Sequence, residues 1–238
     1  MESSYSKGYV TFKDGFIACV PTILGYVGIG IACGIVGKSS GLSILSVVLM
    51  SIIVYGGSSQ FIITGMLVSG APISAIVFTT FLVNLRHFLM SMSVAEYFKE
   101  TSLLKSIGIG TLLTDESYGV LMTAVLKEKQ VSFSWVNGLN ITAYLVWILS
   151  TLLGAILGNV IPDPQSLGLD YALVAMFIGL IILQIEYPLK VRAKATLMVM
   201  LSVAISLYLL SHILSIELSV LAATLIGCTI GVMTDDKH

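Results

Sequence analysis

Long apolar runs separated by short polar stretches make up most of this chain. A helix needs about 20 mostly apolar residues to cross the hydrocarbon core of a bilayer. Transmembrane strands would alternate apolar and polar residues in segments of about ten, and the runs do not alternate in that way. The pattern therefore predicts an all-α, polytopic membrane helix bundle with about eight (six to eight) transmembrane segments, forming a single transmembrane domain over residues 1–238. The expected spans are residues 16–36, 42–68, 72–93, 103–126, 135–158, 171–188, 195–211 and 214–233.

Composition supports the same class. Of the 238 residues 56% are apolar and 11% are charged, and the mean hydropathy is +0.99. A soluble domain carries roughly 25% charged residues, so a soluble enzyme and a disordered chain are both excluded. A net charge of −1 gives no basic excess for binding nucleic acid. The first apolar run is longer than the core of a signal peptide, so we expect it to be retained as a helix.

The distribution of Lys and Arg predicts the orientation, because cytoplasmic loops carry an excess of them. With the N-terminus inside, the cytoplasmic segments would hold eight Lys and Arg residues and the opposite loops three. We therefore expect a multi-pass protein of the bacterial cytoplasmic membrane with both termini cytoplasmic. A weak similarity between residues 41–47 and 168–174 also leaves open a construction from two repeats.

The second span contains an unusual polar segment, residues 55–60, with the sequence YGGSSQ. Paired glycines followed by two serines and a glutamine form helix poorly. Irregular backbone at this depth is tolerated only inside the protein or beside an aqueous cavity, and such broken helices bind substrate in transporters. We expect a break at residues 56–60; the alternative is a kink that merely bends the helix.

Ionisable residues lie inside two consecutive spans, as the doublets Arg86–His87 and Asp115–Glu116. Each charge costs about 2.5–3.5 kcal/mol at a helix centre and therefore needs a partner or a cavity. Because neighbouring helical residues project about 100° apart, Arg86 can pair with one acid while the other acid and His87 remain free to bind a proton. The alternative is one neutral ion-pair cluster that serves only assembly.

Glycine spacing predicts where helices pack. Gly30 and Gly34, Gly154 and Gly158, and Gly227 and Gly231 each lie four residues apart, so each pair shares one helix face. Packing within the chain is the simpler interpretation, and a face for a second subunit is the alternative. The Cys and His residues are too scattered for a metal site, so we expect no metal, no cofactor and no catalytic residue.

Three segments together resemble the AzlC family: residues 55–61 (YGGSSQF), 84–87 (NLRH) and 113–116 (LTDE). The resemblance covers nearly the whole chain. The family comprises the large subunits of two-component branched-chain amino acid exporters of bacteria. The resemblance implies export of leucine, isoleucine and valine, sometimes methionine, with a small AzlD-like membrane partner. A dimer of such heterodimers is left open.

From the polar residues we expect secondary active transport driven by the proton gradient or the membrane potential, since the chain has no P-loop for ATP. A zwitterionic amino acid needs a cation or amide N–H groups for its carboxylate and an acid for its ammonium. The alternatives are a channel for small zwitterions or an intramembrane enzyme. The residues expected to bind substrate or couple transport are Tyr55, Gly56, Gly57, Ser58, Ser59, Gln60, Asn84, Arg86, His87, Asp115 and Glu116.

Overall fold

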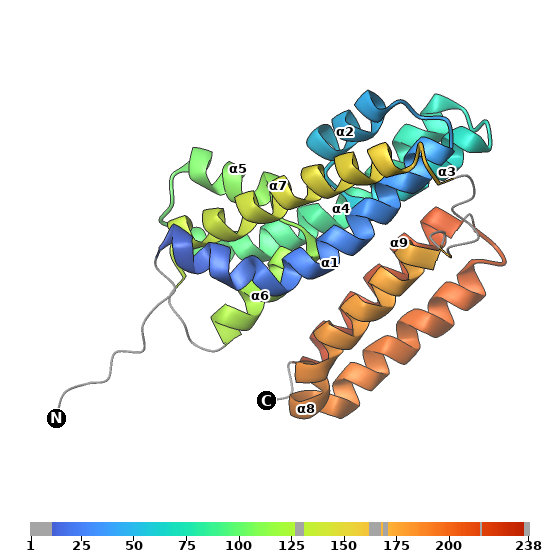
Figure 1. Ribbon diagram of the computed structural model, residues 1–238. Coiled ribbons are helices and arrows are strands. Elements are labelled where there is room, and N and C mark those ends of the chain that lie inside the picture. Colours follow the sequence, from blue (N-terminus) through green and yellow to red (C-terminus); the bar gives the residue numbers. More distant parts are fainter. Residues whose placement is uncertain (1–10, 127–130, 162–167, 169–170, 215, 236–238) are drawn as a thin grey trace. The chain divides into compact units, whose positions relative to one another are not determined.

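The computed structural model describes residues 11–126, 131–161, 168, 171–214 and 216–235 (Figure 1). Within these residues the regular structure is helical, with no strand, which confirms the all-α class. Four helical segments are long and apolar enough to cross a membrane. The helices are α1 (Phe12–Ser39), α2 (Ile44–Ile53), α3 (Gly57–Val68), α4 (Ile73–Ala95), the 3-10 turn η1 (Glu96–Phe98), α5 (Leu103–Thr111), α6 (Asp115–Leu126), α7 (Phe133–Leu157), α8 (Ala172–Leu210) and α9 (Ile216–Asp235).

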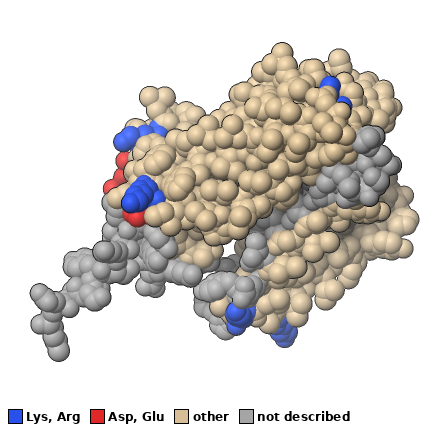
Figure 2. Space-filling model, in the orientation of Figure 1, with Lys and Arg blue, Asp and Glu red and all other residues tan. Residues whose placement is uncertain are grey.

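The outer surface is that of a protein solvated by lipid. Large apolar side chains such as Leu24, Ile73 and Leu104 are more than three-quarters exposed. Figure 2 shows broad uncharged areas along the helices, with the visible Lys, Arg, Asp and Glu side chains in small groups. Contiguous apolar surface of this extent is rare in soluble monomers and matches a bilayer environment.

Helices α1 and α7 form the centre of the first compact unit, residues 1–176. They lie side by side along their lengths (Figure 1) and run in the same direction, because Gly15 meets Trp135 and Gly34 meets Thr151. A Cβ atom on Gly34 would overlap the Thr151 carbonyl oxygen, and one on Gly154 would overlap that of Ile31. The glycine pairs predicted to pack helices therefore do so within the chain, where they let the two backbones approach closely.

The second predicted span is interrupted, as expected, and consists of α2 and α3. The non-helical residues are 54–56, so the break lies slightly before the predicted residues 56–60, and Ser58 to Gln60 form the first turn of α3. Tyr55 adopts a positive φ of 44°, a conformation uncommon for any residue other than glycine. Serines and glutamine are tolerated at the start of a helix, where backbone N–H groups have no intrahelical partner.

The fourth predicted span is divided as well, which the sequence analysis did not anticipate. Helix α5 ends at Thr111 and α6 begins at Asp115. The Thr114 N–H donates to Ser117 Oγ at 2.9 Å, and the Ser117 N–H donates to Thr114 Oγ1 at 3.3 Å. These reciprocal bonds cap the start of α6 in the manner of a capping box, so α6 begins where a threonine is followed by two acids and a serine.

The second unit, residues 177–238, contains most of α8 and all of α9. Helix α8 carries Pro188 and a non-helical residue, Arg192, with φ −141° and ψ 52°. The runs predicted at 171–188 and 195–211 are thus the two parts of α8 on either side of this kink. A Cβ on Gly227 of α9 would overlap the Val203 side chain, so the third glycine pair also marks a helix contact.

The glycine contact between α1 and α7 predicts a stability difference between two substitutions in α1. Gly34→Ala places a methyl group on the Thr151 carbonyl oxygen and should lower the free energy of unfolding by about 1–3 kcal/mol. Gly28→Ala is the matched control, because nothing lies within 4 Å of its Cβ position. Thermal unfolding in detergent can be followed by the fluorescence of the buried Trp135 and Trp147. Equal midpoints for the two variants would contradict the packing described.

Candidate functional site

One small cavity lies where both helix breaks meet. It has about 310 Å³ of empty space, part of it open to the exterior. Because that figure includes open solvent, the cavity as a whole has room for only about one water molecule, and a larger guest would require the walls to move apart. The lining residues come from α1, the α2–α3 connection, α3, α4, the α5–α6 connection, α6 and α7: Tyr26, Tyr55, Gly56, Gly57, Arg86, His87, Thr114, Asp115, Glu116 and Trp147.

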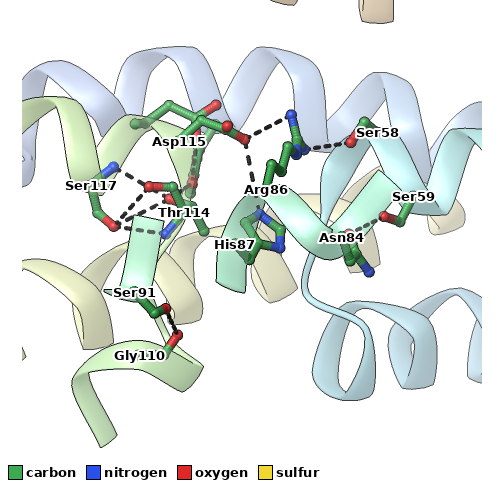
Figure 3. A network of polar contacts seen from close by, with 12 residues as sticks. Ser58, Ser59, Asn84, Arg86, His87, Ser91, Gly110, Thr114, Asp115 and Ser117 are labelled. Atoms are coloured by element: carbon green, nitrogen blue, oxygen red, sulfur yellow. Dashed lines mark hydrogen bonds and ion pairs between the residues drawn. The ribbon is translucent and has the colours of Figure 1, made fainter. Parts of the chain in front are cut away.

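Arg86 of α4 links the two broken spans. Its Nη1 atom lies 3.0 Å from Asp115 Oδ2, and its Nη2 atom donates to Ser58 Oγ in the first turn of α3. The His87 Nε2 atom lies 3.9 Å from the same Asp115 oxygen. Figure 3 shows the Arg86 side chain between Ser58 and Asp115. The expected pairing of Arg86 with one acid is therefore present, and Asp115 is that acid.

Glu116 faces a different neighbour from Asp115, as the angle between adjacent helical residues requires. The Tyr26 hydroxyl of α1 donates to Glu116 Oε2 at 2.8 Å and also lies 2.6 Å from Thr114 Oγ1. Within the part of the chain that the structure describes, Glu116 makes no ion pair. Its carboxyl group is thus held by a neutral hydroxyl rather than by a cation.

The N-terminus of α3 is open toward the cavity. Its N-cap residue, Gly56, is extended and no side chain of the described residues bonds the free backbone N–H groups. A Cβ on Gly57 would lie 2.9 Å from the Trp147 ring, so only glycine fits here without displacing the indole. Free N–H groups and the helix dipole together make this end positive, and Arg86 adds a full charge beside it.

The N-terminus of α6 has the opposite character. The N–H groups of Thr114 and Ser117 are bonded by each other's side-chain hydroxyls there, and Asp115 and Glu116 place two carboxyl groups in the first turn. Acids at a helix N-terminus offset the positive end of the dipole. The cavity therefore has a positive side at α3 and Arg86 and an acidic side at α6.

Four of the predicted site residues do not line the cavity but support α3. The side-chain amide of the fully buried Gln60 donates to Ser51 Oγ at 2.8 Å and accepts from the Trp147 indole N–H at 2.7 Å. Ser51 continues this chain to Thr151 Oγ1 at 2.7 Å. These bonds fix α2 and α3 to α7. Gln60 is one of the four. Ser58 accepts a hydrogen bond from Arg86, and Ser59 and Asn84 bond each other (Figure 3).

Three residues of the cavity were missed by the sequence analysis as site residues. Tyr26 and Trp147 stack edge-to-face, with ring centroids 5.2 Å apart, and both bond polar site residues. Tyr and Trp in membrane proteins are enriched at the interfaces, and their polar tips need partners when buried. The position of Tyr26 and Trp147 well inside predicted spans therefore indicated that each has a buried polar partner. Thr114 gave no such signal, because hydroxyl groups within spans commonly bond their own backbone.

Neither Cys nor His residues add a metal centre to this cavity. Among the residues described, no group of three His, Cys, Asp or Glu side chains is arranged to hold a metal ion. The cavity can bind anionic groups on its α3 side, cationic groups on its α6 side, and uncharged hydrogen-bonding groups on either side.

Comparisons with known proteins agree with this picture. The family model described as "AzlC protein" matches residues 21–161, more than half of the chain. The chain is 28% identical over 160 residues to the "Inner membrane protein YgaZ" of Escherichia coli, covering 65% of this chain and 64% of that protein, slightly under two thirds of its length. It is 27% identical over 180 residues to the "Branched-chain amino acid transport protein AzlC" of Bacillus subtilis, covering 75% and 70%.

A third relative, an "Uncharacterized membrane protein" of Archaeoglobus fulgidus, is 27% identical over 174 residues, covering 72% of this chain and 74% of that protein. No solved structure matches the chain significantly. The family match spans α1 from Pro21 through α7 and therefore includes both helix breaks and the cavity between them. The chain is a membrane protein that belongs to the AzlC family.

Proposed function

We propose that this protein is the large subunit of a secondary active transporter that exports branched-chain amino acids. One observation carries the proposal: the cavity has a positive side, at the N-terminus of α3 and Arg86, and an acidic side, at the start of α6. A zwitterionic amino acid carries two opposite charges a few bonds apart and matches this arrangement. The printed name of the Bacillus subtilis relative supports the same class of substrate.

The α3 side of the cavity is the site for the substrate carboxylate. Free N–H groups follow Gly56, and Gly57 keeps this backbone accessible. Arg86 stands beside them through its bond to Ser58. Helix N-termini and guanidinium groups are the usual partners of carboxylates in proteins, and half-helix N-termini bind anionic substrate groups in transporters.

The α6 side of the cavity is the site for the substrate ammonium. Asp115 and Glu116 both line the cavity there. The aromatic rings of Tyr26, Tyr55 and Trp147 provide apolar surface for an aliphatic side chain. Such a pocket discriminates weakly, because one methylene is worth only about 1–3 kcal/mol. We therefore expect leucine, isoleucine, valine and methionine to compete for one site.

Transport requires the cavity to widen and to open alternately to the two sides of the membrane, because in this structure it is too small for an amino acid. The proton gradient or the membrane potential drives this cycle, with a carboxyl group at the start of α6 as the proton carrier. A small AzlD-like membrane subunit pairs with this chain and assists export. The largest assembly that we propose is a dimer of these heterodimers. Both termini of the chain lie on the cytoplasmic side.

Export itself can be tested in cells. We expect cells loaded with leucine-containing dipeptides to release leucine faster when this chain and its small membrane partner are both produced. External leucine should accelerate the exit of labelled leucine, and the acceleration should saturate, as for a carrier. Release that is unaffected by the chain would contradict the proposal. Release without saturable counterflow would indicate a channel instead.

Arg86 gives a residue-level test. Arg86→Gln removes the guanidinium from the α3 side and should lower the rate of leucine efflux at limiting leucine by about 10- to 100-fold, the worth of charge-assisted hydrogen bonds. Arg86→Lys keeps the charge but cannot bond Ser58 and Asp115 together, so its rate should be intermediate. Lys99→Gln is the matched control, since Lys99 is exposed and pairs with Glu96. Normal efflux in Arg86→Gln would remove Arg86 from the site.

A further inference from the structure

We infer that Glu116, held by Tyr26, is the group at which a proton and the substrate ammonium replace each other. This inference rests on the proposed function and assigns the coupling to one of the two acids. It follows from the different partners that Asp115 and Glu116 have in the cavity, and from the neighbouring Tyr55 hydroxyl, which is buried there without a hydrogen bond of normal distance and angle to the described residues.

Asp115 is already paired with a cation, Arg86. Its Oδ2 atom lies 3.0 Å from Arg86 Nη1 and 3.9 Å from His87 Nε2. A proton on Asp115 would break the pairing with Arg86 and leave the guanidinium without its counter-charge in a low-dielectric site, which is costly. Asp115 is therefore a positioning residue that holds Arg86 against α3.

Glu116 has no cation of its own among the described residues. A buried carboxylate needs a compensating positive charge, and only a proton or an arriving cation can supply one here. The ammonium group of an amino acid is such a cation. Proton and ammonium should then be mutually exclusive on Glu116.

The residues around Glu116 do not provide the counter-charge that a proton or an ammonium group would supply. The titratable or charged residues that face it or its immediate partners are Tyr26 and Cys19 on α1, Tyr55 in the α2–α3 connection, Arg86 and His87 on α4, Asp115 on α6 and Tyr144 on α7. Tyrosine and cysteine are neutral at physiological pH, Arg86 is paired with Asp115, and His87 Nε2 lies 3.9 Å from the same Asp115 oxygen. None of these residues forms an ion pair with Glu116 in the described part of the chain.

Tyr55 adds an independent sign that a ligand belongs at this place. It is only 7% exposed, and its hydroxyl makes no hydrogen bond of normal distance and angle to the described residues. Its ring lines the same cavity, and its backbone is held at a positive φ by the break before α3. A buried hydroxyl without a partner costs free energy, and an ammonium group bound at Glu116 could supply the missing bond.

The exchange balances as a 1:1 antiport. When the cavity faces the cytoplasm, the Glu116 carboxylic acid gives its proton to water on that side, and the carboxylate pairs with the ammonium of the amino acid. When the cavity faces outward, the amino acid leaves and Glu116 takes a proton from the outer side. One amino acid moves out and one proton moves in, so one positive charge enters per cycle and the membrane potential assists export.

Proton release during binding tests this inference. In weakly buffered detergent solution with a pH indicator, the protein with its small partner should release about one proton per leucine bound. Leucine affinity should rise by about tenfold per pH unit over the range in which proton and ammonium compete. Glu116→Gln should release no proton, and its weakened leucine binding should be independent of pH.

Three further variants test the inference even if Glu116→Gln does not fold. Asp115→Asn should bind leucine more weakly but still release a proton. Tyr26→Phe removes the hydroxyl that stabilises the Glu116 carboxylate, so its binding curve should move to higher pH with the stoichiometry unchanged. Glu96→Gln, at an exposed ion pair, should behave as the unchanged protein.

The outcomes separate this inference from the proposed function. If the unchanged protein binds no leucine or related amino acid, the proposed function is wrong and the inference falls with it. If leucine binds without releasing a proton, or if Glu116→Gln still releases one, Glu116 is not the exchange site although the proposed substrate stands. Loss of proton release in Asp115→Asn alone would transfer the role to Asp115.

Discussion

Hydrocarbon cannot donate or accept a hydrogen bond, and the polar parts of this protein are arranged around that constraint. Each charge inside the bilayer costs about 2.5–3.5 kcal/mol unless it finds a partner, and each interrupted helix exposes N–H and C=O groups. Here the two helix breaks and four ionisable side chains share one cavity. The positive end of α3 and Arg86 face an acidic start of α6, so the features that are costly in lipid compensate one another across this cavity.

The pair of helices α1 and α7 makes this arrangement possible. Glycines such as Gly34 and Gly154 bring their backbones together, and the pair then presents Tyr26 and Trp147 from one side. Trp147 holds Gln60 and thereby the start of α3, while Tyr26 holds Glu116 at the start of α6. The two half-helices thus depend on the same scaffold, although α3 begins at residue 57 and α6 at residue 115.

Local sequence features predicted the parts of the fold that local chemistry determines. Residues 55–60 indicated the first helix break, because two glycines and two serines form helix poorly. The free-energy cost of a charge buried in lipid indicated that Arg86 needs an acidic partner. The second break, between α5 and α6, was not predicted because apolar residues continue on both sides of Thr114. A threonine followed by Asp115 and Glu116 is nevertheless a helix-start signal. Tyr26 and Trp147 could not be assigned to partners, since their bonds join residues about 90 positions apart.

An experimental structure of the protein with leucine bound, together with its small membrane partner, would show where the two charged ends of the substrate lie. We expect the leucine carboxylate at the free N–H groups that follow Gly56 and near Arg86, with the ammonium at Glu116. Leucine in the reversed orientation, or bound away from the cavity between α3 and α6, would contradict it.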